Sequence, residues 1–212
     1  MPLLLSIAAT SILAMFLSLA AGIAHTFAVT ASPSEIIVLP KGATFEGQGS
    51  LSRAAVKTIE SAPMIAPGSG GHAKPASAEV VHFHDFPRPG GQDEFGATLR
   101  GADSVAAMRQ FRPDFRLTRG RLFRPGHNEL IVGSGIVKIN PALVPGRTLP
   151  INDDTWTIVG VFHTGRSVDN FTAWADATDL HQTFTHGEPY ESVRVRLRAS
   201  DQLAAFQTYL DK

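Results

Sequence analysis

Residues Leu117–Gly133 read LTRGRLFRPGHNELIVG, and their order of glycines, arginines and apolar residues decides how the middle of this chain folds. Gly120 and Gly126 mark tight turns, because glycine adopts backbone conformations that other residues avoid. After the second turn, Glu129–Val132 (ELIV) is a short apolar run that is typical of a buried strand. The stretch therefore predicts two turns that lead into a strand.

The same stretch contains three arginines close together, Arg119, Arg121 and Arg124. Such a cluster could bind an anionic group, or it could pair with carboxylates of the chain itself, such as Asp114 or Glu129. We favour structural pairing with a carboxylate of the chain.

The composition excludes several classes of protein. The 19 Lys and Arg residues balance 19 Asp and Glu residues, whereas nucleic-acid-binding domains are usually strongly basic. The chain has no Cys, which excludes disulfides, thiolate zinc sites and thiol chemistry. A hydrophobic content of 43% is that of a globular protein, and a chain of 212 residues can bury a substantial core.

A charge-free apolar run, Leu3–Ala24, stands near the start of the sequence. As a helix it would extend ~33 Å at ~1.5 Å per residue, which is enough to cross a hydrocarbon core of ~30 Å. The alternatives are a buried core helix and a cleaved signal peptide, but the apolar part of a signal peptide is ~7–15 residues long and follows a basic start. No Lys or Arg occurs before Lys41. We therefore predict a transmembrane helix within residues 1–30 and an extracytoplasmic domain over residues 31–212.

The remainder of the sequence mixes strand and helix patterns without a strict alternation. We therefore expect an α+β fold with a mixed sheet, in which residues 64–130 could form a second lobe. Loops rich in Pro and Gly separate the elements. The predicted strands cover residues 35–39, 79–85, 97–99, 129–132, 155–162 and 191–198, and the predicted helices cover residues 51–62, 104–110 (capped by Asp103), 177–185 and 200–210.

Three further patterns could carry chemistry. His82 and His84 would share one face of a strand, but two ligands do not close a zinc site, so they are weak candidates for a metal site. Asp153 and Asp154 point apart in an extended chain, and a turn explains them better than a catalytic pair. Residues 68–71 (GSGG) lie in a Pro-rich stretch with no strand before them, so we interpret them as a loop and not as a phosphate-binding motif.

The stretch Leu117–Gly133 resembles the periplasmic core domain of MacB-like and FtsX-like ABC transporter permeases, and other parts of the chain follow in the order of that family. The similar elements are Glu35–Glu46 with its Lys41-Gly42 turn, Ser77–Val81, Leu99-Arg100-Gly101, Gly146-Arg147-Thr148-Leu149, Trp156–Val161, Trp174-Ala175-Asp176 and Ser192–Leu197.

The resemblance covers nearly the whole chain and implies structural roles at turns, strand starts and strand cores. It contributes no catalytic residue, no cofactor-binding residue and no metal ligand. The residues that match the family's motifs are Arg100, Gly101, Gly120, Arg121, Phe123, Pro125, Gly126, Glu129, Gly133, Gly146, Trp156, Gly160, Trp174 and Asp176.

The resemblance implies a permease subunit of the inner membrane that carries motion across the membrane and is not an enzyme. ATP would be bound by a separate cytoplasmic ABC ATPase, and a second permease subunit, membrane lipid and a periplasmic partner or cargo would complete the assembly. Family members have three more membrane helices after this domain, so we expect the sequence to be a fragment of a longer permease or the product of a split gene. The rival hypotheses are an anchored or secreted binding module without an ATPase, and a periplasmic metal-dependent enzyme.

The resemblance also predicts how the two ends of the domain are joined. The run Glu35–Leu39 follows the membrane helix, and Ser192–Leu197 precedes the point where the family's next membrane helix begins. We expect both to lie in one sheet beside Thr155–Phe162, so that both membrane connections leave from one base. The expected core residues are Trp156, Ile158, Val193, Val195, Phe206 and Leu210, and the residues expected to face solvent are Arg194, Arg196 and Arg198.

Alkaline phosphatase fused after Lys212 should be active when the fusion is expressed in a bacterium, because the enzyme folds only outside the cytoplasm. A stable but inactive fusion would contradict the predicted topology. Washing the membranes with carbonate then separates the two exported forms, since a cleaved signal peptide releases a shortened protein and a membrane helix retains the full chain.

Overall fold

The computed structural model describes residues 14–15, 17–18, 34–68, 74–184 and 188–211. Residues 36–212 form one compact unit, which is separate from residues 1–35. Among the residues that the structure describes, no helix has both the length and the apolar character needed to cross a membrane. The membrane helix predicted over Leu3–Ala24 lies almost entirely outside the described residues, as does most of the GSGG loop.

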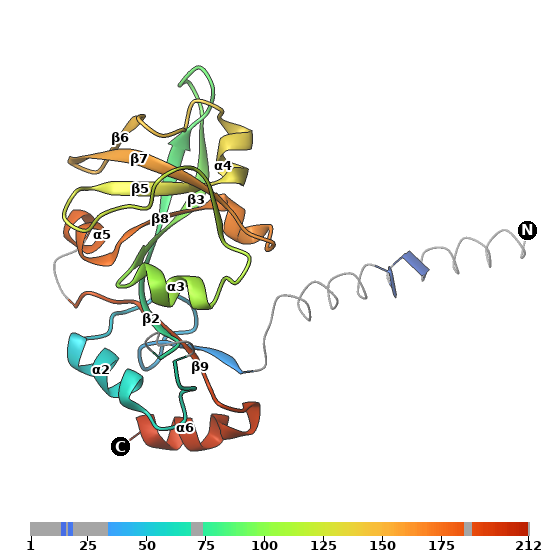
Figure 1. The fold of residues 1–212 in the computed structure, drawn as a ribbon, viewed down its shortest axis with the longest axis vertical. Helices are drawn as coiled ribbons and strands as arrows, with labels where there is room; N and C mark the ends of the chain where they lie inside the picture. The colour runs from blue at the N-terminus through green and yellow to red at the C-terminus, as the bar shows by residue number, and fades with distance from the viewer. Residues whose placement is uncertain (1–13, 16, 19–33, 69–73, 185–187, 212) are drawn as a thin grey trace, which may run out of the picture. The chain divides into compact units, whose positions relative to one another are not determined.

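A nine-stranded mixed sheet forms the centre of the compact unit (Figure 1). The strands follow one another across the sheet in the order β1-β9-β2-β3-β8-β5-β7-β4, and β6 also pairs with β7. Their bounds are β1 Glu35–Val38, β2 Ala76–Pro87, β3 Glu94–Ala102, β4 Arg116–Gly120, β5 Glu129–Gly133, β6 Thr148–Ile151, β7 Asp154–His163, β8 Thr172–Asp176 and β9 Ser192–Arg196.

The antiparallel hairpin of β2 and β3 joins the two ends of the sheet. β3 pairs with β2 from Pro87 to Glu79, whereas β9 pairs only with the first residues of β2, from Ala76 to Glu79. β3 pairs on its other side with β8 in parallel, and β8 leads on to β5 and β7. β2 therefore belongs both to the end formed by β1 and β9 and to the end formed by the remaining strands.

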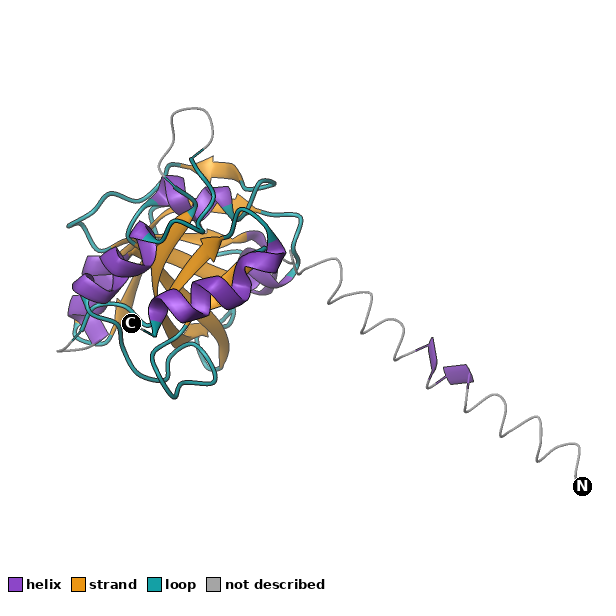
Figure 2. Cartoon of the chain, turned by 90° about the horizontal axis from the view of Figure 1, so that it is seen from below, coloured by secondary structure: helices purple, strands orange, loops and turns teal. Residues whose placement is uncertain are grey.

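The helices are α2 (Arg53–Ser61), α3 (Val105–Gln110), α4 (Ser134–Ile139), α5 (Ala177–Phe184) and α6 (Leu203–Leu210). In Figure 1, α2 and α6 lie together at the β9 end of the sheet. Viewed from that end, the strands lie between helices (Figure 2). α5 packs so closely on β3 that a Cβ atom at Gly101 would stand 2.7 Å from the Cα atom of Ala177, so this position has no room for a side chain.

The structure confirms the α+β class and the mixed sheet. The strands predicted at residues 79–85 and 97–99 are longer than expected, because residues 76–78 pair with β9 and the hairpin pairing continues to Pro87 and Glu94 at one end and to Ala102 at the other. Three strands, β4, β6 and β8, and two helices, α4 and the 3-10 helix Val168–Phe171, were not predicted. Each is only four to six residues long and lacks a clear hydrophobic period, which is the signal that sequence reasoning depends on.

The predicted arrangement of the terminal strands is right in one part and wrong in another. β1 and β9 are neighbours, as expected, but β7 is not beside them, since β2, β3, β8 and β5 lie between β9 and β7. The apolar pattern of residues 155–162 indicates burial without indicating which strand pairs with it. Trp156 of β7 and Val193 of β9 are both fully buried and belong to the same main core as Phe206, as expected, although their strands are not neighbours.

Arg194 and Arg196 of β9 are half-buried, contrary to the expectation from alternation, whereas Arg198, which follows the strand, is exposed as predicted. The side chain of Arg194 is only 16% exposed and its Nε atom lies 3.9 Å from Glu79. Arg196 donates to the carbonyl of Gln110 at 2.7 Å and lies over the Phe111 ring. Alternation in a strand separates apolar from polar side chains, but a second layer here covers the polar side as well.

Two helix starts also differ from the prediction. Ser104, and not Asp103, caps α3 by accepting a hydrogen bond from the backbone of Ala107. Asp103 instead accepts the hydroxyl of Tyr190 at 2.9 Å. Residues Ser200–Gln202 form a 3-10 turn, so α6 begins only at Leu203, and Leu203 itself is 37% exposed.

Phe206→Ala should reduce the free energy of unfolding of residues 36–212 by ~3–5 kcal/mol, because a buried phenylalanine is replaced by a cavity. Phe206 is 1% exposed and belongs to the main hydrophobic core. The control on the same helix is the exposed Gln207→Ala, which should change stability by less than ~0.5 kcal/mol. Equal losses in urea denaturation would show that α6 does not anchor this end of the sheet.

Candidate functional site: a buried network of arginines and carboxylates

The centre of the network is Arg100 on β3, whose guanidinium contacts two carboxylates. It donates to Glu79 on β2 at 2.5 Å, and its two terminal nitrogens contact both oxygens of Glu46. Glu79 is fully buried and Glu46 is 18% exposed. Glu46 also accepts the hydroxyl of Ser192 at 2.8 Å. A planar guanidinium that faces two carboxylates in this way is held in a fixed orientation.

A second layer of charges surrounds Glu79. Arg112, which follows α3, has its Nη1 atom 3.8 Å from Glu79 and its Nε atom 3.5 Å from Asp169. Arg194 of β9 approaches the same Glu79 oxygen at 3.9 Å. The guanidinium of Arg112 lies over the ring of the buried Trp174, 4.3 Å from its centroid. Buried charges are tolerated only when they are paired in this way.

The ion pairs fix the protonation states of the central groups. Burial alone would raise the pKa of Glu46, but the bonds from Arg100 and Ser192 bring it below its usual value. Burial alone would lower the pKa of Arg100, and the facing Glu79 and Glu46 raise it instead. For Arg112, burial prevails and lowers the pKa despite the nearby Glu79 and Asp169. The central pair of Arg100 and Glu46 is therefore an ionised pair around neutral pH.

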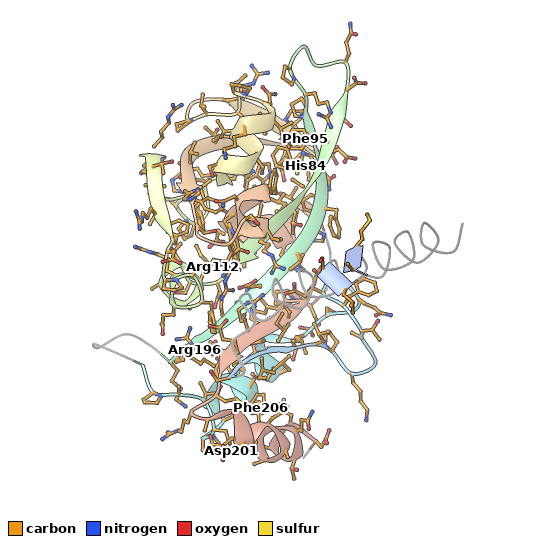
Figure 3. The ribbon with its side chains drawn as sticks, turned by 90° about the vertical axis from the view of Figure 1, so that its right-hand side faces the viewer. His84, Phe95, Arg112, Arg196, Asp201 and Phe206 are labelled. Atoms are coloured by element: carbon orange, nitrogen blue, oxygen red, sulfur yellow. The ribbon has the colours of Figure 1, made fainter. Side chains whose placement is uncertain are left out.

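The network connects elements that are distant in sequence. Glu46 lies between β1 and α2, Glu79 and Arg100 lie on the β2–β3 hairpin, Ser192 and Arg194 lie on β9, and Asp169 lies on the 3-10 helix Val168–Phe171 before β8. Figure 3 shows Arg112 midway along the molecule, with Arg196 and Phe206 towards one end and His84 and Phe95 towards the other. The arrangement is suited to holding the two ends of the sheet in a fixed relation.

A second ion pair stabilises the turns of the Leu117–Gly133 stretch. Arg121 donates to both oxygens of Glu129 at 2.5 Å, and the backbone N–H of Arg124 donates to Glu129 at 3.0 Å. The bond from Arg121 lowers the pKa of Glu129. Structural pairing is thus confirmed for Arg121, whereas Arg119 does not join this pair.

The turn that follows is held by a carboxylate from α5. Asp179 accepts the backbone N–H groups of Gly126 and His127, at 2.8 Å and 3.2 Å. Asp176 accepts the N–H groups of Thr178 and Asp179 and so starts α5. Burial raises the pKa of Asp176. Two residues of the predicted motif set, Gly126 and Asp176, are thereby connected through α5.

The predicted motif glycines stand where the backbone leaves no room for a side chain or requires a positive φ. A Cβ atom at Gly120 would lie 2.1 Å from the carbonyl oxygen of Val159, and one at Gly133 would lie 2.3 Å from that of Asn170. A Cβ atom at Gly160 would likewise lie 2.3 Å from the carbonyl oxygen of Arg121. Gly146 has open space around it but a φ of +95°, a conformation that favours glycine.

The remaining motif residues lie in the core or in the turns. Phe123 and Trp174 belong to a smaller hydrophobic cluster on the side of the sheet near α3, while Trp156 belongs to the main core. The carbonyl of Pro125 lies 2.7 Å from Nδ1 of His127. The motif residues are therefore distributed over the fold, and only Arg100 and Trp174 reach the central network.

His82 and His84 do not form a metal centre with other described residues, because no group of three or more His, Asp or Glu side chains comes close enough together. His82 stacks on Phe184 with ring centroids 4.3 Å apart, and His84 meets Phe86 edge to face. Burial lowers the pKa of both histidines. The structure places them in aromatic contacts on β2.

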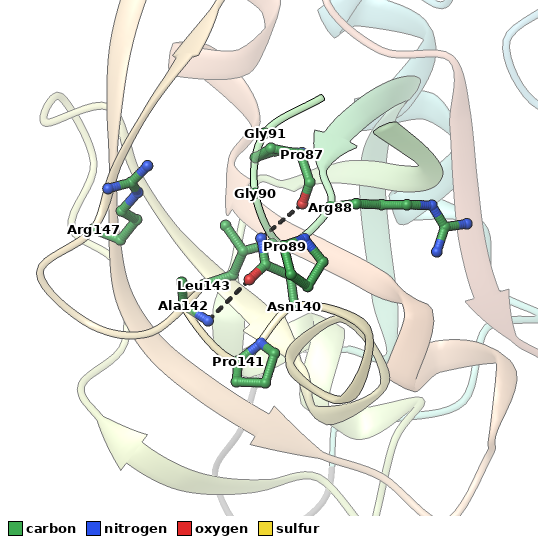
Figure 4. Close-up of a pocket in the computed structure, with 10 residues that line it drawn as sticks. All are labelled: Pro87, Arg88, Pro89, Gly90, Gly91, Asn140, Pro141, Ala142, Leu143 and Arg147. Carbon is green, nitrogen blue, oxygen red and sulfur yellow. Dashed lines mark hydrogen bonds between the residues drawn. The ribbon is translucent and has the colours of Figure 1, made fainter. Parts of the chain in front are cut away.

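A pocket of about 460 Å³ lies at the tip of the β2–β3 hairpin (Figure 4). It is enclosed by Pro87–Gly91 on one side and by Asn140–Leu143 and Arg147 on the other. Asn140 joins the two sides by donating to the carbonyl of Pro87 at 2.8 Å. Arg88 and Arg147 point away from the pocket in different directions, so its interior is formed mainly by apolar and backbone groups (Figure 4).

Sequence reasoning identified Arg100 and Trp174 but missed their charged partners. Glu46, Glu79, Arg112, Asp169 and Arg194 are separated by up to about 150 positions, and no local pattern relates them. One signal was available, because Glu79 stands between the small residues Ala76–Ala78 and the apolar pair Val80-Val81. A carboxylate in such a strand requires a buried cation somewhere in the fold.

Arg100→Ala should reduce the free energy of unfolding of residues 36–212 by ~3–5 kcal/mol, because Glu79 would remain buried without its main partner. Arg100→Lys should cost less, since the charge is kept while the two-pronged contact is lost. The exposed Arg119→Ala is the matched control and should change stability by less than ~0.5 kcal/mol. If Arg100→Ala is as mild as the control in urea denaturation, the network does not stabilise the fold.

Two solved structures have a similar fold. The extracellular domain of the ABC-type transporter YknZ from Gram-positive bacteria is similar, with a TM-score of 0.57 and 14% identity over 81% of this chain and 88% of that one. The periplasmic region of MacB from Actinobacillus actinomycetemcomitans gives a TM-score of 0.56 and 14% identity over 83% of this chain and 79% of that one. None of the curated proteins compared with the chain matches it.

At this level of identity the two structures show a shared fold and nothing finer. The family model of the MacB-like periplasmic core domain, however, matches residues 3–212, which is nearly the entire sequence. The resemblance inferred from the order of the motifs is thereby confirmed. The chain belongs to the family of MacB-like periplasmic core domains.

Proposed function

We propose that this chain is the extracytoplasmic part of an ABC transporter permease, and that it passes ATP-driven motion from the membrane to a partner or cargo outside the cytoplasm. The family is one of transporter periplasmic domains and not of enzymes. On this proposal residues 1–30 contain the membrane helix, a cytoplasmic ABC ATPase supplies the energy, and a second permease subunit completes the transporter.

The observation that carries the proposal is that the compact unit begins and ends at the same place. Val38 and Leu39, just after β1, line a pocket of about 450 Å³ together with Leu210 and Asp211 at the end of α6. Residues of α2, among them Ala55 and Ile59, complete the lining. Two chain connections that leave from one base can move that base as a unit.

Stiffness between this base and the far end is the second requirement, because a domain that deforms internally does not transmit displacement. The network around Glu79 supports it, since Arg100 of the hairpin binds both Glu79 and Glu46, and Glu46 in turn accepts the hydroxyl of Ser192 at the start of β9. Interfaces and cores that are packed in this way shift as rigid bodies and not by continuous deformation.

The absence of cysteine makes the proposal testable with spin labels. Lys57→Cys on α2 and Asp93→Cys near the hairpin tip are both exposed positions at opposite ends of the compact unit. In the transporter reconstituted with its ATPase, the distance between these two labels should stay the same with and without ATP. The distance between Asp93→Cys labels on the two permease subunits should change.

Arg100→Gln provides the matched comparison, because it weakens the connection between base and hairpin without touching the base itself. In that variant the distribution of distances between the labels at positions 57 and 93 of one domain should become broader on ATP binding. A domain whose internal distance changes in the unaltered protein, or a pair of domains that does not move at all, would contradict the proposed transmission of motion.

A further inference from the structure

The basic residues of this chain are concentrated in one segment although the chain as a whole is neutral. Residues 109–147 contain seven Arg and one Lys against two acidic residues, a net charge of +6, so the remainder carries a net charge of −6. Arg112 of this segment is used in the buried network and Arg121 in the pair with Glu129. Arg124 also contributes its backbone N–H to Glu129. Arg116 and Arg119 belong to neither of these ion pairs.

Two of these arginines lie on β4, which is the last strand of the sheet. On one side β4 pairs with β7, whereas none of the described strands pairs with its other side, and all five of its residues are exposed. Arg116 lies opposite His163 and Arg119 opposite Val161, so both side chains project from the same side of the strand. Within the part of the chain that the structure describes, neither of them forms an ion pair with a carboxylate.

A third arginine, Arg147, lies along the edge of β7 that β4 borders. The backbone of Gly146 and Arg147 exchanges hydrogen bonds with Ile158, at 2.8 and 2.9 Å, which places Arg147 beside the strand that β4 also borders. Pro145 is close to Gly120 at the end of β4, since a Cβ atom there would lie 3.0 Å from its ring. Arg147 therefore lies along the same edge of β7 as the two arginines of β4.

We propose that the free edge of β4 binds an extended acidic segment of a partner protein, which adds to the sheet as a further strand. An edge strand offers unpaired N–H and C=O groups to a second extended chain. Carboxylates at alternate positions of that chain would meet Arg116 and Arg119, because opposite charges on neighbouring strands stabilise the pairing.

The charges also argue against the other obvious occupant, a second copy of the same edge. Two β4 strands side by side would bring arginines against arginines, and like charges directly opposite one another destabilise a strand pair. The carboxylates of an acidic strand would instead attract the arginines of β4. The proposed transmission of motion does not depend on this surface. The result of the binding test therefore neither supports nor contradicts that proposal.

The test uses the full chain in detergent and a fluorescent peptide that alternates Glu and Thr over about ten residues, with binding followed by fluorescence anisotropy. Arg116→Glu combined with Arg119→Glu should weaken binding by ~10-fold or more. The control, Lys41→Glu combined with Lys57→Glu, makes the same change in charge at exposed positions away from β4 and should alter the affinity by less than ~2-fold. If the Glu pair does not fold, the Arg116→Gln and Arg119→Gln pair provides the same comparison without charge reversal.

A second peptide separates strand addition from simple attraction between charges. It has the same sequence with methyl groups on alternate backbone nitrogens, which removes hydrogen-bond donors and leaves every carboxylate in place. Strand addition predicts that this peptide binds at least ~10-fold more weakly. Equal binding of the methylated peptide, equal binding by the doubly substituted β4 variant, or no binding of the acidic peptide at millimolar concentration would each overturn the proposal.

Discussion

The ion pair between Glu79 and Arg100 is the constraint on which the rest of the structure depends. A carboxylate with no solvent exposure is compatible with a stable fold only when a cation stands beside it. That requirement fixes the register of the β2–β3 hairpin, because Arg100 must reach Glu79 from the neighbouring strand. It also brings in the segment around Glu46, whose carboxylate uses the other side of the same guanidinium.

Two hydrophobic clusters pack around the strands that the ion pairs join. The main core fills the space between the sheet and the helices that include α2 and α6. A smaller cluster, which contains Trp174 and Phe162, covers the opposite side near α3. Arg112 lies on the Trp174 ring, so the polar network and the smaller cluster share a boundary. Around Trp174 and Arg112, side chains therefore cover both faces of the sheet.

The parts of this fold that could be predicted from sequence are those encoded locally. The strand at Glu129–Gly133, the helix over Arg53–Ser61 and the turns at Gly120 and Gly126 have short-range signals in hydrophobic period, capping residue and glycine. The strand order could not be derived, because burial shows that β7 is in the core without showing that β5 and β4 are its neighbours. The orientation of Arg194 was misjudged for a related reason: alternation defines two faces of a strand, and only the tertiary structure shows what covers each.

The pairing of β2 with β9 has a consequence for how the protein folds. Ala76 lies opposite Val195, so this contact joins residues about 120 positions apart, and β1 reaches β9 over a still longer span. Contacts of such long range are late and slow, since the entropy of closing a large loop must be overcome before any of them stabilises the chain. The hairpin and the strands next to it have much shorter loops to close. During synthesis and export, β1 therefore has no partner until β9 emerges, and this unpaired interval is when the chain depends most on protection from aggregation.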